Sequence, residues 1–305
     1  MAGYVARRLL DAALGVLGVT TIAFLAIRLS GDPVALLVTE YATPEDIARV
    51  RRTLGLDQPL WVQYARFLAD ALRGNFGESL RFIKPAAPLV YSALPATVQL
   101  AAAALLVALA VALPLGMVAG VRRGSAIDGA AIVLATLGQS MPYFWLGILL
   151  IMVFAVRLQW LPAFGSESWR HLILPALTLA MTPMARIARI VRSGMVEVLT
   201  QDYIRTAHAK GLRASAVVVR HALPNLAIPL VTLLALDFGT LLGGAVVTET
   251  IFAWPGVGRL VVQAIQSRDY PVVQAVVFYL ATAVVLINLT LDVIYARLDP
   301  RVRYG

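Results

Sequence analysis

Six stretches of the chain hold about 20 mostly apolar residues each, the length that an α-helix needs to cross the hydrocarbon core of a bilayer. They are Leu9–Leu29, the part of the uncharged run 85–121 that begins near Leu94, Gly129–Val156, Leu172–Val191, Leu226–Thr248 and Val272–Ile294. This pattern predicts an all-α, polytopic membrane protein with six transmembrane helices.

The polar segment between the first two stretches predicts two short helices. Thr43 is placed to cap the first helix, Pro44 to occupy its first turn and Gly55 to end it. Its apolar residues share one face and are Ile47, Val50 and Leu54. The second helix is the amphipathic stretch 61–73. We expect both to form a small helical element on the outer surface, either with a functional contact of its own or only packed against the bundle.

Composition agrees with a membrane protein and excludes some kinds of functional site. Hydrophobic residues make up 60% of the chain and charged residues 14%, with a mean hydropathy of +0.80. A soluble domain carries about 25% charged residues. The absence of cysteine excludes disulfides and thiolate sites. The net charge of +9 is better explained by cytoplasmic loops than by binding of nucleic acid.

The placement of basic residues predicts the orientation. With the N-terminus inside, the inner segments carry fourteen Lys and Arg, and the outer ends and short loops carry five. The long segment 30–93 holds seven basic and seven acidic residues, so it favours neither orientation. We therefore expect a multi-pass protein of the inner membrane with both termini cytoplasmic. Because no convincing cleavage site precedes Gly31, the first stretch is interpreted as a retained signal-anchor rather than a cleaved signal peptide.

The inner segment between the fourth and fifth helices is too patterned for a simple connector. Thr200 or Asp202 is placed to cap a short helix, with Lys210 near its C-terminus and Gly211 as a left-handed stop. Ala207 lies four residues before Gly211, so the two predict a flat patch that another protein can approach closely. Downstream, a Pro-Asn pair is expected to break the chain where it re-enters the membrane.

This segment resembles the conserved cytoplasmic loop of type I ATP-binding-cassette (ABC) importer permeases. That loop has a small residue, three intervening residues and a glycine, followed by Pro-Asn; Ala207, Gly211, Pro224 and Asn225 occupy these positions. Thr206 stands where a glutamate often opens the family motif. Further short sequences along the chain are similar to the dipeptide, oligopeptide and nickel branch of the family. They are Gly31–Pro33, Leu54–Pro59, Gly74–Ser79, Leu94–Thr97, Gly256–Arg259, Arg268–Pro271 and Leu298–Arg301.

The resemblance implies that the short inner helix is a coupling helix that docks on an ATPase subunit. The residues so assigned are Asp202, Tyr203, Ala207, Lys210, Gly211, Leu212, Pro224 and Asn225. The expected partners are a second, homologous permease subunit in a heterodimer, two cytoplasmic ABC ATPases, an extracytoplasmic substrate-binding protein and the lipid bilayer. The chain itself has no G-x-x-x-x-G-K-[ST] sequence, so ATP and Mg would be used by the partners and not bound here.

On this resemblance the chain divides into four parts. They are an N-terminal transmembrane helix (1–30), an extracytoplasmic helical segment (31–93), an ABC type-1 transmembrane core (94–296) with the coupling loop 193–225, and a cytoplasmic tail (297–305).

Four polar residues in or beside the predicted spans are candidates for the pathway or its gate. Gln139 and Ser140 interrupt the third span before a proline and either line the path or only relax helix packing. Asp237 lies within the fifth span, where an acid is costly and is either cavity-lining or structurally paired. Glu249 is expected at the outer surface, where a gating or binding-protein contact is an option. The three histidines do not have metal-ligand spacing, and no catalytic residue is predicted.

The predicted function is that of a permease that forms half of a translocation pathway for short peptides. A nickel-complex or glutathione-type importer of the same family is the alternative solute class. An ion-coupled secondary transporter would need more buried ion ligands than Asp237, and an intramembrane enzyme would need a catalytic constellation inside the spans.

Overall fold

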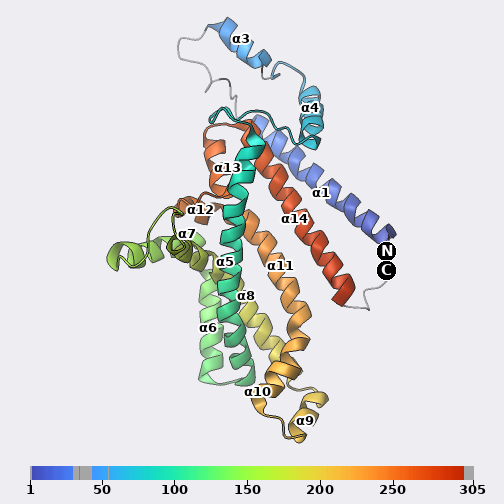
Figure 1. Ribbon diagram of the computed structural model, residues 1–305, viewed down its shortest axis with the longest axis vertical. Coiled ribbons are helices and arrows are strands. Elements are labelled where there is room, and N and C mark those ends of the chain that lie inside the picture. The colour runs from blue at the N-terminus through green and yellow to red at the C-terminus, as the bar shows by residue number, and fades with distance from the viewer. Residues whose placement is uncertain (1, 30–33, 35–42, 54, 299–305) are drawn as a thin grey trace. The chain divides into compact units, whose positions relative to one another are not determined.

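A computed structural model describes residues 2–29, 34, 43–53 and 55–298, and every regular element among them is helical (Figure 1). Five helical stretches are long and apolar enough to cross a membrane, and a sixth is added if a bent helix pair forms one span. The stretches are Leu10–Leu29, Ala86–Val121, Arg170–Val198, Ala214–Gly244 and Tyr270–Thr290, and the bent pair is Ala126–Ser140 with Tyr143–Arg157. The all-α prediction is confirmed, and each predicted span has its counterpart.

The chain forms two compact units, each of which is built from two stretches of sequence. One comprises Met1–Thr97 with Pro255–Leu289, and the other comprises Val98–Trp254 with Thr290–Gly305. The long helices α5 (Ala86–Val121) and α14 (Tyr270–Leu298) each run from one unit into the other.

In the first unit, the two predicted short helices are present. Helix α3 (Pro44–Thr53) begins after Thr43, whose Oγ1 accepts a hydrogen bond of 3.2 Å from the backbone N–H of Asp46. Asp46 returns the contact by accepting from the Thr43 N–H and hydroxyl, and the hydroxyl contact holds the pKa of this carboxyl below its usual value. Gly55 has φ +65°, so the predicted stop is confirmed. Leu54 lies outside the described residues.

Helix α4 (Leu60–Leu72) packs through aromatic rings against α1 (Ala2–Leu29). The Phe24 ring stacks on Phe67 with centroids 5.6 Å apart and meets Tyr64 at 5.3 Å. Phe24 is 1% exposed, so this contact removes a large apolar ring from solvent. The amphipathic pattern of 61–73 therefore reflects a packed helix.

A buried carboxylate in the same unit holds the loop that follows α4. Asp269, directly before α14, accepts hydrogen bonds from the backbone N–H groups of Leu80 (3.2 Å) and Arg81 (3.3 Å) and from the Ser79 hydroxyl. The Ser79 hydroxyl in turn accepts from the Phe82 N–H at 2.9 Å. Asp269 is fully buried, so these donors replace the water that it lost.

In the second unit, small residues allow α5 and α8 (Arg170–Val198) to cross closely. A Cβ on Gly116 would lie 2.7 Å from the carbonyl oxygen of Ala188, and one on Gly120 would lie 2.6 Å from the Cβ of Met195. Any larger residue at either position would force the helices apart. Such close approach is typical of helix pairs in membranes, where packing rather than water drives association.

The third predicted span, Gly129–Val156, is broken. Helix α6 (Ala126–Ser140) and the run formed by α7 (Tyr143–Leu150) and η1 (Ile151–Arg157) meet at an angle of 103°. Met141 adopts an extended conformation because it precedes Pro142, which has no N–H to continue the helix. With 15 residues, α6 is about 22 Å long and does not by itself cross a bilayer core of about 30 Å.

Candidate functional site: the inner loop and the arginines of helix α8

The loop after α8 carries a separate short helix, α9 (Asp202–Ala209), which projects beyond the ends of α8 and α11 (Ala227–Gly244) in Figure 1. The residue that precedes it is Gln201, whose side chain makes no capping hydrogen bond. The prediction that Thr200 or Asp202 caps this helix is therefore wrong. Thr200 instead donates to the carbonyl of Glu197 at 2.7 Å, and Asp202 is already helical, with its carboxylate 3.5 Å from Nη1 of Arg205.

The predicted end of α9 is confirmed. Lys210 terminates the helix, and its N–H donates to the carbonyl of Thr206 at 3.0 Å. Gly211 follows with φ +76°, a conformation that side chains with a Cβ rarely adopt. No atom lies within 4 Å of the position that a Cβ on Gly211 would occupy. The glycine is thus needed for its backbone conformation and leaves an open surface beside it.

The faces of α9 differ from the predicted arrangement. Ala207 is only 6% exposed and Ile204 only 1%, so both pack against the chain itself. The expected patch of Ala207 and Gly211 is therefore not a common surface, because Ala207 faces inward. The exposed side carries Tyr203, which is 44% exposed, and beyond the helix Leu212, which is 40% exposed. An apolar residue and an aromatic ring held on a projecting helix make a surface suited to contact with another protein.

The chain returns to the membrane without a break. A short turn, α10 (Ala214–Ala216), is followed by the π-helix η2 (Val217–Ala222) and the 3₁₀-helix η3 (Leu223–Leu226), which leads directly into α11. Pro224 and Asn225 therefore change the type of helix instead of interrupting it. The Asn225 amide donates to the carbonyl of His221 at 2.6 Å, a carbonyl that a regular α-helix would bond to the backbone N–H of residue 225.

The end of this run is packed tightly on α8. A Cβ on Gly194 would lie 2.3 Å from Cδ2 of Leu226, so the leucine side chain packs directly against this glycine and would have to shift for a larger residue. Leu226 is 4% exposed. The loop with α9 is consequently fixed to α8 at both its ends: by direct continuation at Val198 and by packing at Leu226.

Asp237, a candidate for the pathway, is fully buried in α11 and forms an ion pair with Arg186 of α8. Arg186 Nη2 lies 2.6 Å from Asp237 Oδ1. Of the two predicted roles for Asp237, these contacts favour structural pairing over lining a cavity. The pairing neutralises a charge that lipid would not tolerate.

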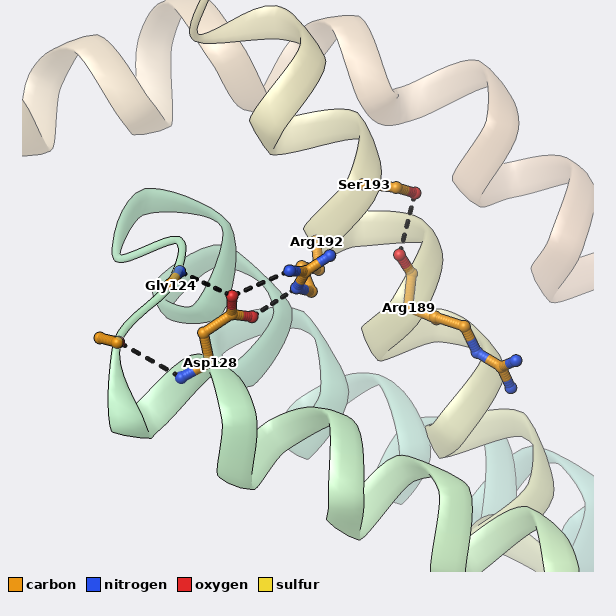
Figure 2. A network of polar contacts seen from close by, with 6 residues as sticks. Gly124, Asp128, Arg189, Arg192 and Ser193 are labelled. Atoms are coloured by element: carbon orange, nitrogen blue, oxygen red, sulfur yellow. Dashed lines mark hydrogen bonds and ion pairs between the residues drawn. The ribbon is translucent and has the colours of Figure 1, made fainter.

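Two further arginines of α8 contact helix α6 at intervals of three residues. Arg192 forms a two-point contact with Asp128, in which Nη2 lies 2.8 Å from Oδ2 and Nε also donates to the carboxylate (Figure 2). The Gly124 N–H donates to the same carboxylate at 2.9 Å. Arg189 donates to the side-chain oxygen of Gln139, at the last turn of α6.

Sequence reasoning did not single out Asp128. The signal was present, because Ser125 and Asp128 stand three apart at the start of a helix, and Ser125 Oγ accepts from the Asp128 N–H at 3.3 Å. What the sequence could not show is that Asp128, 3% exposed, also reaches an arginine 64 residues away.

The remaining two pathway candidates are placed apart from these contacts. Ser140 is exposed, and its hydroxyl donates to the carbonyl of Thr136 at 2.8 Å. Glu249, in the short helix α12 (Val246–Ile251), is fully buried within the protein. Its position at the outer side of the membrane stays a prediction. Its backbone carbonyl accepts from the Trp254 N–H at 2.9 Å, which closes a turn over the end of α12. Among the described residues, no three His, Asp or Glu side chains gather as metal ligands would.

Comparison with known families gives two matches that together span nearly the whole chain. Residues 112–304 match the family described as binding-protein-dependent transport system inner membrane component. Residues 1–101 match the corresponding N-terminal family of such membrane components.

Curated relatives match from end to end. The chain is 40% identical to the dipeptide transport system permease protein of Alkalihalophilus pseudofirmus and 42% identical to the glutathione transport system permease protein of Escherichia coli K12, each over 100% of both chains. Among solved structures, the inward-facing MetNI methionine ABC transporter is similar with a TM-score of 0.55 at 21% identity, over 69% of this chain and 96% of that one. This likeness shows a shared permease fold.

Proposed function

Because this chain belongs to the family of binding-protein-dependent transport system inner membrane components, it is a permease subunit of an ABC importer, and we propose that its solutes are short peptides. The observation that carries the proposal is its similarity along its full length to permeases named for dipeptide and glutathione transport. The glutathione-type solute remains the second candidate, since relatives of that name reach 43% identity.

We further propose that α9 is the coupling helix. It projects from the bundle and exposes Tyr203, its loop exposes Leu212 just beyond the helix, and the loop is joined to α8 at both ends. A push on this helix would therefore be passed to α8 and α11, which fits alternating access driven by a separate motor. The motor would be two ABC ATPase subunits. They would dock on the membrane side where α9 projects, and they, not this chain, would bind ATP and Mg.

The remaining partners follow from the same proposal. A second, homologous permease would complete the pathway, and an extracytoplasmic binding protein would deliver the solute. Both termini of this chain would lie in the cytoplasm, with the outer helices α3 and α4 on the opposite side.

Reconstitution of the complete transporter into proteoliposomes tests the proposed function. We expect uptake of trialanine to need ATP, Mg and the binding protein, and to stop when the ATPase subunits are left out. Parallel assays with glutathione decide between the two solute classes. Uptake by this chain without nucleotide or partners would contradict the proposal.

A further inference from the structure

Three arginines stand at intervals of three residues in the second half of α8, and only two of them are matched by a carboxylate. Arg186 pairs with Asp237 and Arg192 with Asp128. Arg189, between them, donates to the neutral amide oxygen of Gln139 and has no acidic partner among the residues that the structure describes. Its side chain is exposed. Among the described residues, the second half of α8 therefore presents one guanidinium without an acidic partner, on a helix that is long and apolar enough to span the membrane.

The guanidinium of Arg189 reaches toward the end of α6 that lies opposite to Asp128. Asp128 and Gln139 stand eleven residues apart on α6, which corresponds to about 16 Å along that helix. Asp128 is close to a membrane face, because only the short loop 122–125 separates α6 from α5. Arg189 stands three residues from Arg192, about 4.5 Å along α8, but its side chain reaches Gln139 at the far end of α6. Figure 2 shows it directed away from the Asp128–Arg192 pair.

A charged side chain within a membrane span faces a water-filled cavity or a charged partner, because lipid does not solvate it. A guanidinium has five N–H donors, and the contact with Gln139 leaves others free to bind a carboxylate at two points. Gln139 lies at the break between α6 and α7.

We propose that Arg189 lines the solute pathway and binds a carboxylate group of the solute, with Gln139 holding the guanidinium in position. This inference rests on the proposed function, since a short peptide carries a C-terminal carboxylate. It adds a specificity-determining residue to the permease: solutes with a free carboxylate would be favoured over their amides.

The first test asks whether Arg189 faces water, and it needs no knowledge of the solute. The chain contains no cysteine, so Arg189→Cys introduces its only thiol. In the assembled transporter we expect a membrane-impermeant thiol reagent to modify Arg189→Cys. The matched control is Leu106→Cys on α5, an apolar residue that is 67% exposed and expected to face lipid. If Arg189→Cys stays as unreactive as the control, the position is not in the pathway and the inference is overturned.

The second test measures carboxylate recognition with trialanine and trialanine amide in proteoliposomes. We expect Arg189→Gln to lower trialanine uptake about tenfold and to change uptake of the amide less than twofold, because only the free carboxylate loses a charged partner. Arg189→Lys should restore most of the difference. The binding protein is the same in every reaction, so its own preference cancels when each variant is compared with the unmodified transporter.

An equal loss for both peptides would assign Arg189 a structural role or a contact with the second permease and would overturn the inference, as would no loss at all. If the unmodified transporter takes up neither peptide, the proposed solute class fails instead. The thiol-labelling result still decides in that case whether Arg189 faces the pathway.

Discussion

Single residues decide how α8 and the loop that follows it are held in place. Arg186 and Asp237 together bring no net charge into a span, and each would leave the other uncompensated if removed. Gly211 acts differently, because it contributes only a backbone conformation next to open space. These two kinds of residue predict different consequences of substitution.

For the ion pair, we expect Asp237→Asn and Arg186→Gln each to lower the free energy of unfolding by about 2 kcal/mol. This is below the full cost of breaking a buried pair, because the Arg186 side chain is 35% exposed. The double substitution should cost less than the sum of the two. Thermal unfolding of the detergent-solubilised protein measures this, and strictly additive losses would contradict a direct pairing.

For the loop, Gly211→Val should leave membrane insertion intact and lower both uptake and solute-stimulated ATPase activity at least tenfold. A β-branched residue at φ +76° forces the end of α9 to rearrange. Gly55→Val is the matched control, since Gly55 also has a positive φ but lies in the outer segment. Normal uptake by Gly211→Val, or an equal loss in the control, would remove the coupling assignment.

At the scale of elements, polar contacts between distant segments fix the loops. Asp269 ties the loop 79–82 to the start of α14, and the Thr97 hydroxyl accepts from the N–H of Val257, the first residue of α13 (Val257–Gln266), at 2.8 Å. Both contacts join parts of the first unit that are more than 150 residues apart in the sequence.

We expect Asp269→Asn to free the loop 79–82 and to destabilise the first unit by about 1–3 kcal/mol, because an amide turns one acceptor into a donor facing backbone N–H groups. Trypsin should then cleave faster at Arg81 or Lys84. Asp57→Asn, at an exposed position, serves as the control. Unchanged cleavage in Asp269→Asn would show that other contacts hold the loop.

The sequence predicted elements well where local chemistry determines them. The Thr43 cap, the Gly55 and Gly211 stops and the interruption at Pro142 all follow from the residues at those positions. The inward face of Ala207 and the burial of Glu249 depend on segments far along the chain, so periodicity could not reveal them. The same holds for Arg189. The sequence counts it only among the basic residues of the inner segments, and its contact with Gln139 of α6 is visible only in the structure.

At the scale of the whole molecule, the break at Pro142 controls the topology. If α6 and the α7–η1 run cross the membrane together, the described part of the chain has six spans, and if they return to the same side it has five. An even number of spans places both termini on one side, and an odd number separates them.

We expect short epitope tags at the two termini to be protected equally in sealed right-side-out vesicles and digested equally in inverted ones. Tags inserted in the segment 55–59 should show the opposite pattern. Protection of one terminus and digestion of the other would mean that the bent pair re-enters and that the proposed orientation needs revision.

The close crossing of α5 and α8 at Gly116 and Gly120 has a mechanical consequence. Because the two helices already lie close together at these glycines, neither helix can slide along the other without a collision between their atoms. A force delivered at α9 would therefore turn α8 and the crossing part of α5 as a single stiff lever, so that a small tilt at one membrane surface becomes a wide displacement at the other.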